Sequence, residues 1–322
     1  MKHLPLFLFL LTACQTAPRQ DNPPVTGVPV PPAKPAPKPD TLRFLVLGDW
    51  GWGSPEQRAL AAEMDTFSRQ FKPHFVVSVG DNFYGYGVES TTDPLWKTMF
   101  EDVYTAPSLQ IPWYVALGNH DYPKNPQAQV EYSATSPRWR MPARYFTFSR
   151  KLQGEDAVRF VFLDTNPMID NYRNNPAFPE YPNASKQDPV RQRVWLDSVL
   201  RASPEPWKIV VGHHPVYCAG TYYFDTPELI EHLRPRLETN RVQAYFCGHE
   251  HNLQHLKVSG EATDYFISGS GGGVREAGRD PRTRFSATEN GFAAVSIRTD
   301  SLFVQYRNKT GALIYEMGRG RN

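Results

Sequence analysis

The chain alternates between continuous apolar runs and amphipathic segments over most of its length. Apolar runs that end in polar residues are typical of strands buried on both faces, and they occupy residues 42–49, 74–81, 112–121, 157–166, 207–215 and 242–251. Four intervening segments predict helices, at 55–71, 95–104, 188–201 and 226–238. Ser54 and Pro55 are typical of a helix N-cap and first helical position, and Asp93-Pro94 opens the second helix in the same way.

The last part of the chain has shorter periods. The stretches TDYFISGSGG, FAAVSIRTD and LFVQYRN, between residues 263 and 308, predict short strands joined by close turns, as in an antiparallel sheet. Strand–helix units followed by such strands indicate an α/β sandwich of two sheets flanked by helices. In sheets of this class, ligands bind beyond the carboxyl ends of the strands. The polar residues at the strand ends are therefore the candidates for function.

Residues 1–40 follow a different pattern. A basic start and a short apolar core predict an export signal over 1–13, too short to span a bilayer. The letters LTAC resemble a bacterial lipobox, so we expect Cys14 to be lipidated; a cysteine buried in a small N-terminal helix is the alternative. Residues 14–40 are rich in proline and predict an extended linker. The remaining 41–322 are expected to form one large domain, held on a membrane through Cys14.

Composition narrows the class of partner. The 322 residues carry a formal net charge of +2 and are of ordinary composition for a folded enzyme. Proteins whose main partner is nucleic acid usually concentrate basic residues in a stripe. The charge therefore argues against nucleic acid, and a small-molecule substrate is favoured.

Potential metal ligands follow one predicted strand after another. A single aspartate after a strand is usually a turn residue, and a single histidine is usually structural. Of the nine histidines, however, one (His3) lies in the export signal and five of the other eight fall at predicted strand ends. Oxygen and imidazole donors without thiolate suit Zn, Fe, Mn or Ni. The candidate residues are Asp49, Asp81, Tyr84, Asn119, His120, His213, His249 and His251.

Such donors could hold two ions about 3.5–4 Å apart, which activate water and clamp the oxygens of an in-line displacement at phosphorus. The motifs GDWG, GDNFY, GNHD, GHHP and GHEH extend in this order from residue 48 to residue 251. With them the sequence resembles the calcineurin-like metallophosphoesterases, and most closely the purple acid phosphatases of the tartrate-resistant type. The resemblance covers residues 41–322. It implies an αββα sandwich of two mixed sheets, and hydrolysis of phosphate monoesters by a metal-bound hydroxide.

The resemblance also implies a first ion, Fe(III) in relatives, bound by Asp49, Tyr84 and His251 with Asp81 as a bridge to the second. A deprotonated tyrosine prefers a hard trivalent ion, and its charge transfer to Fe(III) gives the purple colour of the family. A tyrosine merely packed in a turn is the alternative. It would leave a colourless enzyme with two zinc or two manganese ions.

The second ion, Fe(II), Zn or Mn, would be bound by Asn119, His213 and His249. The family pattern Gly-His-x-Pro selects His213 as the ligand, which leaves His214 near the substrate or packed behind the site. His120 follows the ligand Asn119, and the resemblance implies that it faces the substrate, where it stabilises the phosphate or protonates the leaving group.

One segment departs from the family. Relatives carry a further histidine, facing the substrate phosphate, shortly after Gly-His-x-Pro, and here that stretch reads VYCAGTYYFD. Tyr222 or Tyr223 could bind the phosphate instead, or nothing replaces the histidine. The departure puts an acidic pH optimum in doubt.

Three other segments have open interpretations. The connection 164–190 is long and rich in proline, which is typical of a lid or binding loop, and its Asn-Ala-Ser at 183–185 is a formal glycosylation acceptor that a bacterial lipoprotein would leave bare. The glycine-rich 268–276 lacks the pattern of a P-loop, so we expect it to pack under the site. Cys218 and Cys247 are either a disulfide or two buried thiols.

The function hypothesis is an exported acid phosphatase on the periplasmic face of an outer membrane or on the cell surface. A phosphodiesterase or nucleotide hydrolase that uses the same two ions is the first alternative. A surface-tethered binding lipoprotein with a relic site is the second, and a lost ligand would mark it; all seven expected ligand positions are filled.

Overall fold

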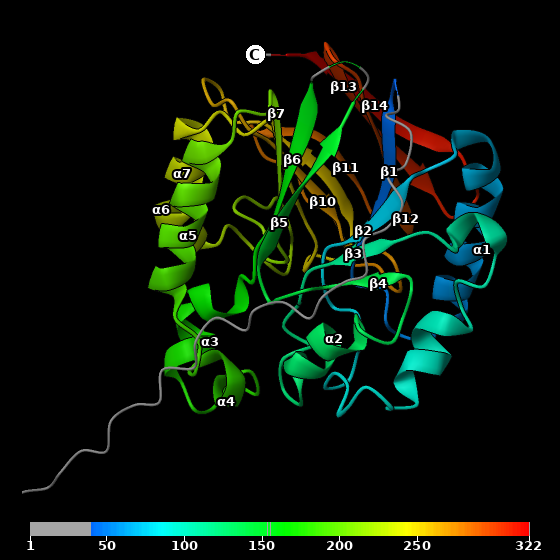
Figure 1. The fold of residues 1–322 in the computed structure, drawn as a ribbon, viewed down its shortest axis with the longest axis vertical. Coiled ribbons are helices and arrows are strands. Elements are labelled where there is room, and N and C mark those ends of the chain that lie inside the picture. Colours follow the sequence, from blue (N-terminus) through cyan, green and yellow to red (C-terminus); the bar gives the residue numbers. More distant parts are fainter. Residues whose placement is uncertain (1–39, 153, 155, 322) are drawn as a thin grey trace, which may run out of the picture.

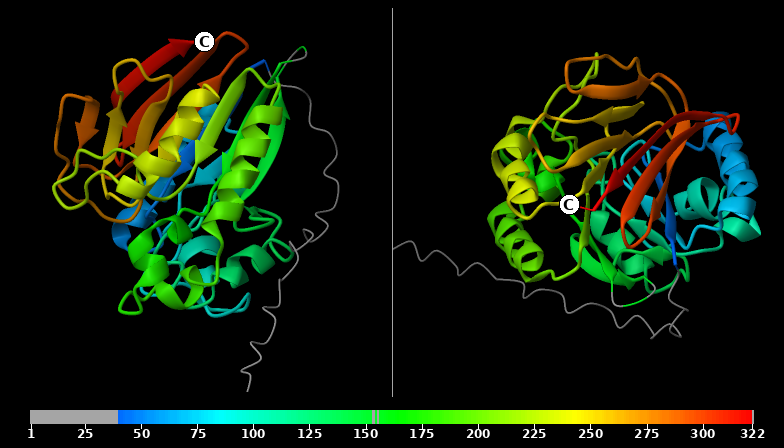
Figure 2. Two further views of the ribbon diagram at one scale, coloured as in Figure 1. Left: turned by 90° about the vertical axis from the view of Figure 1, so that its left-hand side faces the viewer. Right: turned by 90° about the horizontal axis from the view of Figure 1, so that it is seen from above.

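Two seven-stranded sheets lie face to face between helices in the computed structural model, which describes residues 40–152, 154 and 156–321. Helix α1 (Pro55–Phe71) covers the outer face of one sheet, and α5 (Pro189–Ala202), α6 (Pro227–His232) and α7 (Arg234–Thr239) cover the other (Figure 1, Figure 2). This αββα sandwich confirms the predicted fold. The predicted export signal, Cys14 and the linker up to residue 39 lie outside the described residues.

The first sheet combines the N-terminal strands with the C-terminal meander. Its parallel strands are β1, β2, β3 and β4, and β12 joins the other side of β1 in antiparallel register. In order across the sheet, its strands are β14 (Leu313–Gly320), β13 (Ser301–Asn308), β12 (Gly291–Ile297), β1 (Leu42–Leu47), β2 (Phe75–Ser78), β3 (Trp113–Val115) and β4 (Trp139–Arg140).

The second sheet has a parallel centre and antiparallel edges. Strands β6, β7, β8 and β10 run parallel, while β5, β9 and β11 pair in antiparallel fashion. The prediction of antiparallel pairing in the tail is confirmed for β10 with β9, but it is wrong for the other side of β10, which pairs in parallel with β8 from the strand–helix core. In order, its strands are β11 (Thr283–Ala287), β9 (Leu253–Leu256), β10 (Asp264–Ser268), β8 (Ala244–Cys247), β7 (Trp207–Val211), β6 (Ala157–Phe162) and β5 (Phe146–Lys151).

Aromatic side chains join the two sheets. Phe44 of β1 stacks on Phe75 of β2, with ring centroids 5.1 Å apart, and meets Phe160 and Phe246 of the other sheet edge-on at 5.4 and 6.3 Å. All four are buried, and burying an aromatic side chain of this size contributes about 1.5–3 kcal/mol. The apolar runs read from the sequence thus form the core, and their polar ends emerge at one edge of the sandwich.

Two predicted helices differ from the structure. The segment predicted as a helix over 226–238 breaks at Leu233, because Pro235 has no N–H to donate to the preceding turn. The segment 95–104 forms a π-helical turn, Trp96–Glu101, in which the Asp102 N–H donates to the Lys97 carbonyl. Trp96 and Phe100 both pack on Trp139 from this turn, so tertiary packing sets its width.

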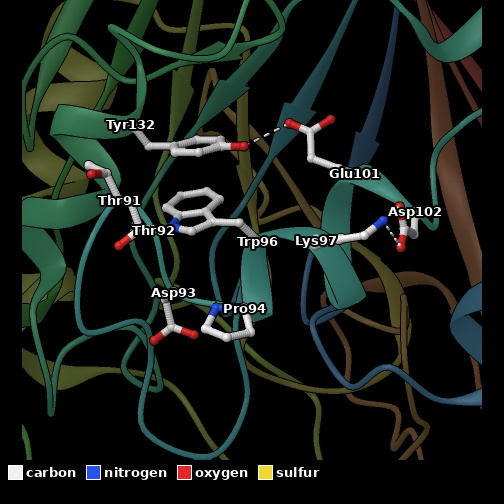
Figure 3. Close-up of a pocket in the computed structure, with 9 residues that line it drawn as sticks. All are labelled: Thr91, Thr92, Asp93, Pro94, Trp96, Lys97, Glu101, Asp102 and Tyr132. Atoms are coloured by element: carbon white, nitrogen blue, oxygen red, sulfur yellow. Dashed lines mark hydrogen bonds and ion pairs between the residues drawn. The ribbon is translucent and has the colours of Figure 1, made fainter.

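The π-helical turn borders a shallow surface depression together with Tyr132, the last residue of α2 (Pro126–Tyr132) (Figure 3). Tyr132 stacks on Trp96 and donates to Glu101, while Lys97 pairs with Asp102. These polar groups satisfy one another, so the depression shows no sign of a ligand site.

The connection 164–190 contains short helices: a 3₁₀ turn at Asn166–Met168, α3 (Asp170–Asn174) and α4 (Tyr181–Ala184); a further 3₁₀ turn lies at Pro107–Leu109. Within the described part of the chain, no helix combines the length and the apolar character that crossing a bilayer requires.

Candidate metal centre

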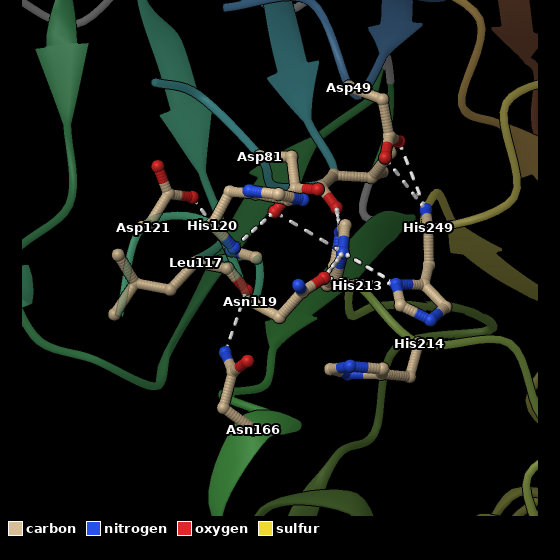
Figure 4. A network of polar contacts seen from close by, with 12 residues as sticks. Asp49, Asp81, Leu117, Asn119, His120, Asp121, Asn166, His213, His214 and His249 are labelled. Atoms are coloured by element: carbon tan, nitrogen blue, oxygen red, sulfur yellow. Dashed lines mark hydrogen bonds and ion pairs between the residues drawn. The ribbon is translucent and has the colours of Figure 1, made fainter. Parts of the chain in front are cut away.

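The candidate ligands meet at the carboxyl edge of the parallel strands. Asp49 follows β1, Asp81 follows β2 and Asn119 follows β3 in the first sheet, while His213 follows β7 and His249 follows β8 in the second (Figure 4). Their side chains point toward one another at this edge. Strands predicted from separate parts of the sequence therefore deliver their polar ends to one place, as parallel topology requires.

One group of donors forms around Tyr84. Its hydroxyl lies 2.8 Å from His251 Nε2 and 3.1 Å from Asp49 Oδ1. The Asp49 carboxylate also accepts the backbone N–H of His249 at 3.0 Å, which fixes its orientation. Trp52 stacks on the outer face of the Tyr84 ring, with centroids 4.1 Å apart, and holds the phenol over the site.

A second group of donors forms around Asn119. Its Oδ1 lies 3.1 Å from His213 Nε2 and 3.0 Å from His249 Nδ1. Asp81 reaches both groups. Its Oδ1 lies 3.5 Å from His213 Nε2 and accepts the backbone N–H of His120 at 2.9 Å, and ligand atoms of Asp81, Asp49 and His251 lie within 4.8 Å of one another. Asp81 is therefore placed between the two groups.

The protonation of the second group shows that a cation fits there. His213 Nδ1 donates to the Val79 carbonyl at 2.9 Å, so Nε2 carries a lone pair. Asn119 donates through Nδ2 to Glu180 at 3.3 Å, so its Oδ1 is an acceptor as well. The contact between His213 Nε2 and Asn119 Oδ1 thus joins two acceptors without a proton. A metal ion held by His213 and Asn119 would remove this repulsion, and the second hydrogen bond of each group would fix it as a ligand.

The pKa values of Asp49, Tyr84 and His251 are shifted in the direction expected for groups built around a positive charge. Burial alone would raise the pKa of Asp81, but the charges of His213 and His120 outweigh burial and lower it. Burial, and then the charge of Asp81, raises the pKa of Asp49 well above its usual value. Burial followed by both carboxylates raises the pKa of Tyr84. Burial lowers the pKa of His251 to about 3, with the charge of Arg275 as the next cause. Neutral imidazoles keep lone pairs for a metal, and a cation would reverse the shifts of the acidic groups.

The backbone is strained at three of the candidate ligands. Asp49, Asp81 and His249 have φ of 55°, 52° and 69°. These values lie in the left-handed region that non-glycine residues rarely adopt. Such strain costs on the order of 1–3 kcal/mol per residue and is retained mainly where function requires it. The neighbouring glycines serve the same close packing: a Cβ on Gly118 would lie 2.1 Å from Asp81 Oδ1 and one on Gly248 2.2 Å from Asp49 Oδ2.

The predicted substrate-facing residues differ in how close they lie to the candidate ligands. His120 lies with its ring 4.4 Å from that of Tyr84, and its Nδ1 faces the Gly85 carbonyl at 3.5 Å. Tyr223 places its ring 4.2 Å from His249, whereas Tyr222 is 72% exposed and forms no hydrogen bond among the described residues. Tyr223 is therefore the better placed of the two tyrosines.

His214 is held apart from the ligand role by Thr165. The Thr165 hydroxyl accepts the backbone N–H groups of His213 and His214. These two N–H groups occupy both acceptor lone pairs of the hydroxyl. The hydroxyl therefore donates its own proton to His214 Nδ1, which lies 2.7 Å away. The remaining proton of the His214 ring lies on Nε2, which is buried without a hydrogen-bond partner among the described residues. His214 lies near His213 and His249, but this tautomer offers a donor and no lone pair.

Three residues of the site were missed by the sequence analysis. Glu180, from the connection 164–190, orients the Asn119 amide, which ties that connection to the centre. Asp121 accepts backbone N–H groups from the loops that follow β2 and β3. Arg275 lies in the glycine-rich segment 268–276, and its side chain donates a hydrogen bond to the His249 carbonyl at 3.3 Å. The Asp of the GNHD motif was a visible signal for Asp121; the other two lie far in sequence from their partners.

The remaining open segments are resolved in part. The glycine-rich segment packs under the centre as predicted, because a Cβ on Gly269 would lie 2.8 Å from Asp49 Oδ2 and one on Gly272 2.1 Å from Trp52. Cys218 and Cys247 are both buried free thiols, which corresponds to the second of the two interpretations.

Comparison with known proteins agrees with this geometry. Residues 42–253 match the family model described as calcineurin-like phosphoesterase. The chain is 35% identical to purple acid phosphatase 3 of Arabidopsis thaliana over 288 residues, which cover 85% of this chain and 76% of that protein. It is 34% identical to tartrate-resistant acid phosphatase type 5 of Homo sapiens, covering 85% of this chain and 90% of that protein.

The chain belongs to the purple acid phosphatases. A solved structure titled GAP50, the anchor in the inner membrane complex of Plasmodium, superposes with a TM-score of 0.75 at 24% identity over 88% of this chain and 89% of that one, a likeness that shows the fold alone. Within its family, this purple acid phosphatase is an enzyme of the acid phosphatase type. The family implies a dinuclear metal centre. The oxygen and nitrogen atoms of Asp49, Asp81 and His251, and of the histidines that include His213 and His249, could hold metal ions of such a centre.

Proposed function

We propose that the protein hydrolyses phosphate monoesters at a mixed-metal centre of Fe(III) with Fe(II), Zn or Mn. The observation that carries the proposal is the pair of donor groups joined by Asp81, in which His213 Nε2 and Asn119 Oδ1 face each other at 3.1 Å without a proton. When bound, the two ions supply a water acidic enough to serve as nucleophile and positive charge for the phosphoryl oxygens.

In this proposal Asp49, Tyr84 and His251 hold the first ion, and Asp81 bridges the two. The phenol of Tyr84 must lose its proton to bind, although burial and the neighbouring carboxylates hold its pKa high. A trivalent ion lowers the pKa of a coordinated phenol more than a divalent ion does, because its larger charge stabilises the phenolate more strongly. The buried position of Tyr84 therefore favours iron at this site.

The second ion is held by Asn119, His213 and His249. His120 is proposed as the residue that meets the substrate: its ring lies beside Tyr84, and its backbone N–H is already used by Asp81. From there the imidazole can donate a hydrogen bond to the phosphoryl group or a proton to the leaving oxygen.

The direct test is hydrolysis of phenyl phosphate by purified, metal-replete protein, measured beside bis(4-nitrophenyl) phosphate across a wide pH range. Preferential turnover of the monoester supports the proposal. Preference for the diester, or for a nucleotide, would replace it with the phosphodiesterase or nucleotide hydrolase alternative. Absence of turnover of every ester by protein that contains two ions per chain would favour a binding lipoprotein.

Iron at the first site has its own test. Metal analysis and the visible spectrum of the protein should show iron and a phenolate-to-iron absorption band. Tyr84→Phe removes the phenolate oxygen and should bleach the band. A band of parental position and intensity in that variant would refute the assignment of Tyr84, while the two-ion phosphatase proposal could stand on the other ligands.

We further propose that residues 41–322 work as one domain carried by the 14–40 linker on a lipidated Cys14. The sequence LTAC alone supports this location. Labelling of the expressed full chain with a fatty acid, compared with Cys14→Ser, tests it. Labelling that persists in the variant would be incompatible with an anchor at Cys14.

A further inference from the structure

Arg275 is anchored to the segment that supplies two of the candidate ligands. Its backbone N–H donates to the His251 carbonyl at 2.7 Å, and its Nη1 donates to the His249 carbonyl at 3.3 Å. The side chain therefore begins and ends beside the turn that carries both histidines. Its position depends on the fold of the centre rather than on a flexible loop tip.

The charge of Arg275 is unpaired in the described part of the chain. No carboxylate lies within ion-pair distance of its guanidinium there, whereas Arg282, which is also half-buried, is paired with Asp225 and Asp280. The charge of Arg275 acts on Asp49 and Glu250 only at longer range. Its charge reaches the centre, since it is the largest influence after burial that lowers the pKa of His251. A half-buried cation without a direct ion pair, beside a phosphoesterase centre, can bind an anion.

Two tyrosines fix the direction of the guanidinium. Its central carbon lies 5.1 Å from the ring centroid of Tyr223 and 5.8 Å from that of Tyr222. Both contacts are within the range of a cation–π interaction, and Tyr223 in turn lies against His249. Of the five N–H groups of the guanidinium, the His249 carbonyl uses one, and the others have no hydrogen-bond partner among the described residues.

We propose that Arg275 is a phosphate-binding residue that donates to oxygens of the phosphoryl group held at the metal centre. The inference rests on the proposed function and adds a residue to the substrate site. A guanidinium stays charged at any pH of interest and binds two oxygens in a fork, which suits a dianionic phosphoryl group. Its contacts to Tyr222 and Tyr223 give the VYCAGTYYFD segment a role, since these rings orient the cation.

The test compares Arg275→Gln with Arg279→Gln in metal-loaded full-length protein. Arg279 is the matched control, because it is exposed further along the same loop and contacts only Ser286, at 3.4 Å, among the described residues. Inorganic phosphate binding is measured by calorimetry, together with metal content and the kcat and KM for phenyl phosphate. We expect R275Q to weaken phosphate binding about 10- to 100-fold, the effect of a hydrogen bond to a charged group, with metal content unchanged and R279Q like the parent.

Three results would overturn the inference. Parental phosphate binding in R275Q is the first. Loss of metal in R275Q, which would assign Arg275 to holding His249 and His251, is the second. The third is a loss confined to substrates with an additional anionic group on the leaving part. If instead the unmodified protein, with two ions bound, neither binds phosphate nor turns over phenyl phosphate, the proposed function itself fails.

A measurement on the unmodified protein removes dependence on the folding of the variant. Phenylglyoxal modifies exposed arginines, and mass spectrometry follows each site separately. Inorganic phosphate should slow modification of Arg275 in the metal-loaded protein and leave that of Arg279 unchanged. Equal rates at Arg275 with and without saturating phosphate would contradict the inference.

Discussion

Replacing Asp121 with asparagine tests how the loops that follow β2 and β3 are held together. The Asp121 carboxylate is fully buried and accepts at both oxygens. Oδ1 accepts from the Phe83 N–H at 3.1 Å and from Gln129 Nε2 at 2.8 Å, and Oδ2 accepts from the Gly118 N–H at 2.8 Å and Asn82 Nδ2 at 3.2 Å. These loops carry Asp81, Tyr84 and Asn119, so the same carboxylate supports the metal centre.

The size of the effect follows from these contacts. An asparagine has one oxygen and one NH2 group in place of two oxygens. In either orientation of its amide, two buried N–H donors of the protein therefore face the NH2 group and lose their acceptor. A buried donor without an acceptor costs about 1–3 kcal/mol. We therefore expect Asp121→Asn to lower the free energy of unfolding by about 3 kcal/mol and to reduce metal uptake as well.

The assay is urea unfolding of the metal-free protein, followed by circular dichroism. Burial, followed by the charge of Asp81, raises the pKa of Asp121 to about 7, so the comparison is made at pH 8, where the carboxylate is ionised. Asp102→Asn is the control, because Asp102 pairs with Lys97 at the exposed surface and such a substitution changes stability by about 0.5 kcal/mol or less. A loss for D121N no larger than that for D102N would refute the reasoning.

Three further outcomes are expected. Burial alone would raise the pKa of Asp264, but the hydrogen bond from His255 and the charge of Lys257 are among the contacts that outweigh burial and lower it. Asp264→Asn should therefore lower the free energy of unfolding by about 3 kcal/mol at pH 7, because its basic partners are left without a counter-charge. Because a lowered pKa contributes stability only above the unfolded value, that loss should shrink as the pH of urea unfolding falls below about 4, and a constant difference down to pH 3 would contradict it. Gly118→Ala should abolish tight binding of the second metal ion, measured by metal analysis, because its Cβ would displace the Asp81 carboxylate; two ions per chain in this variant would refute the argument. Metal ions at 100 times their dissociation constant should raise the free energy of unfolding by about 2.7 kcal/mol, and a urea midpoint that does not respond to metal would count against a folded-state site.

The sequence was sufficient for the parts of the fold that repeat a local pattern. Short apolar runs that end in Gly-Asp and other turn residues favour buried strands over buried helices, and the central strands and α1 appear where they were predicted. The sequence also contains the signal for the break between α6 and α7, which is the proline at position 235. The π-helical turn and the parallel placement of β10 were not accessible in the same way, because each depends on packing against distant aromatic residues or strands.

The candidate ligands were also predictable, for a topological reason. Parallel strands carry their carboxyl ends to one edge, so polar residues after successive strands must meet there. Asp49 and His249 are 200 residues apart and are joined by a hydrogen bond. The chemical type of the donors then indicates a metal, because oxygen and imidazole groups at that density repel one another without a cation.

What the sequence determined by itself is therefore the sandwich, the family and the set of candidate ligands. Tertiary structure alone decided how those candidate ligands are held: which nitrogen of His213 and His214 carries the proton, and that Glu180 turns the Asn119 amide. It also decided that Arg275 stands beside the centre without a direct ion pair in the described part of the chain. The physical reason is that a hydrogen bond or an unpaired charge is a property of two groups and their surroundings. Its partners lie far apart along the chain, and no local pattern records them.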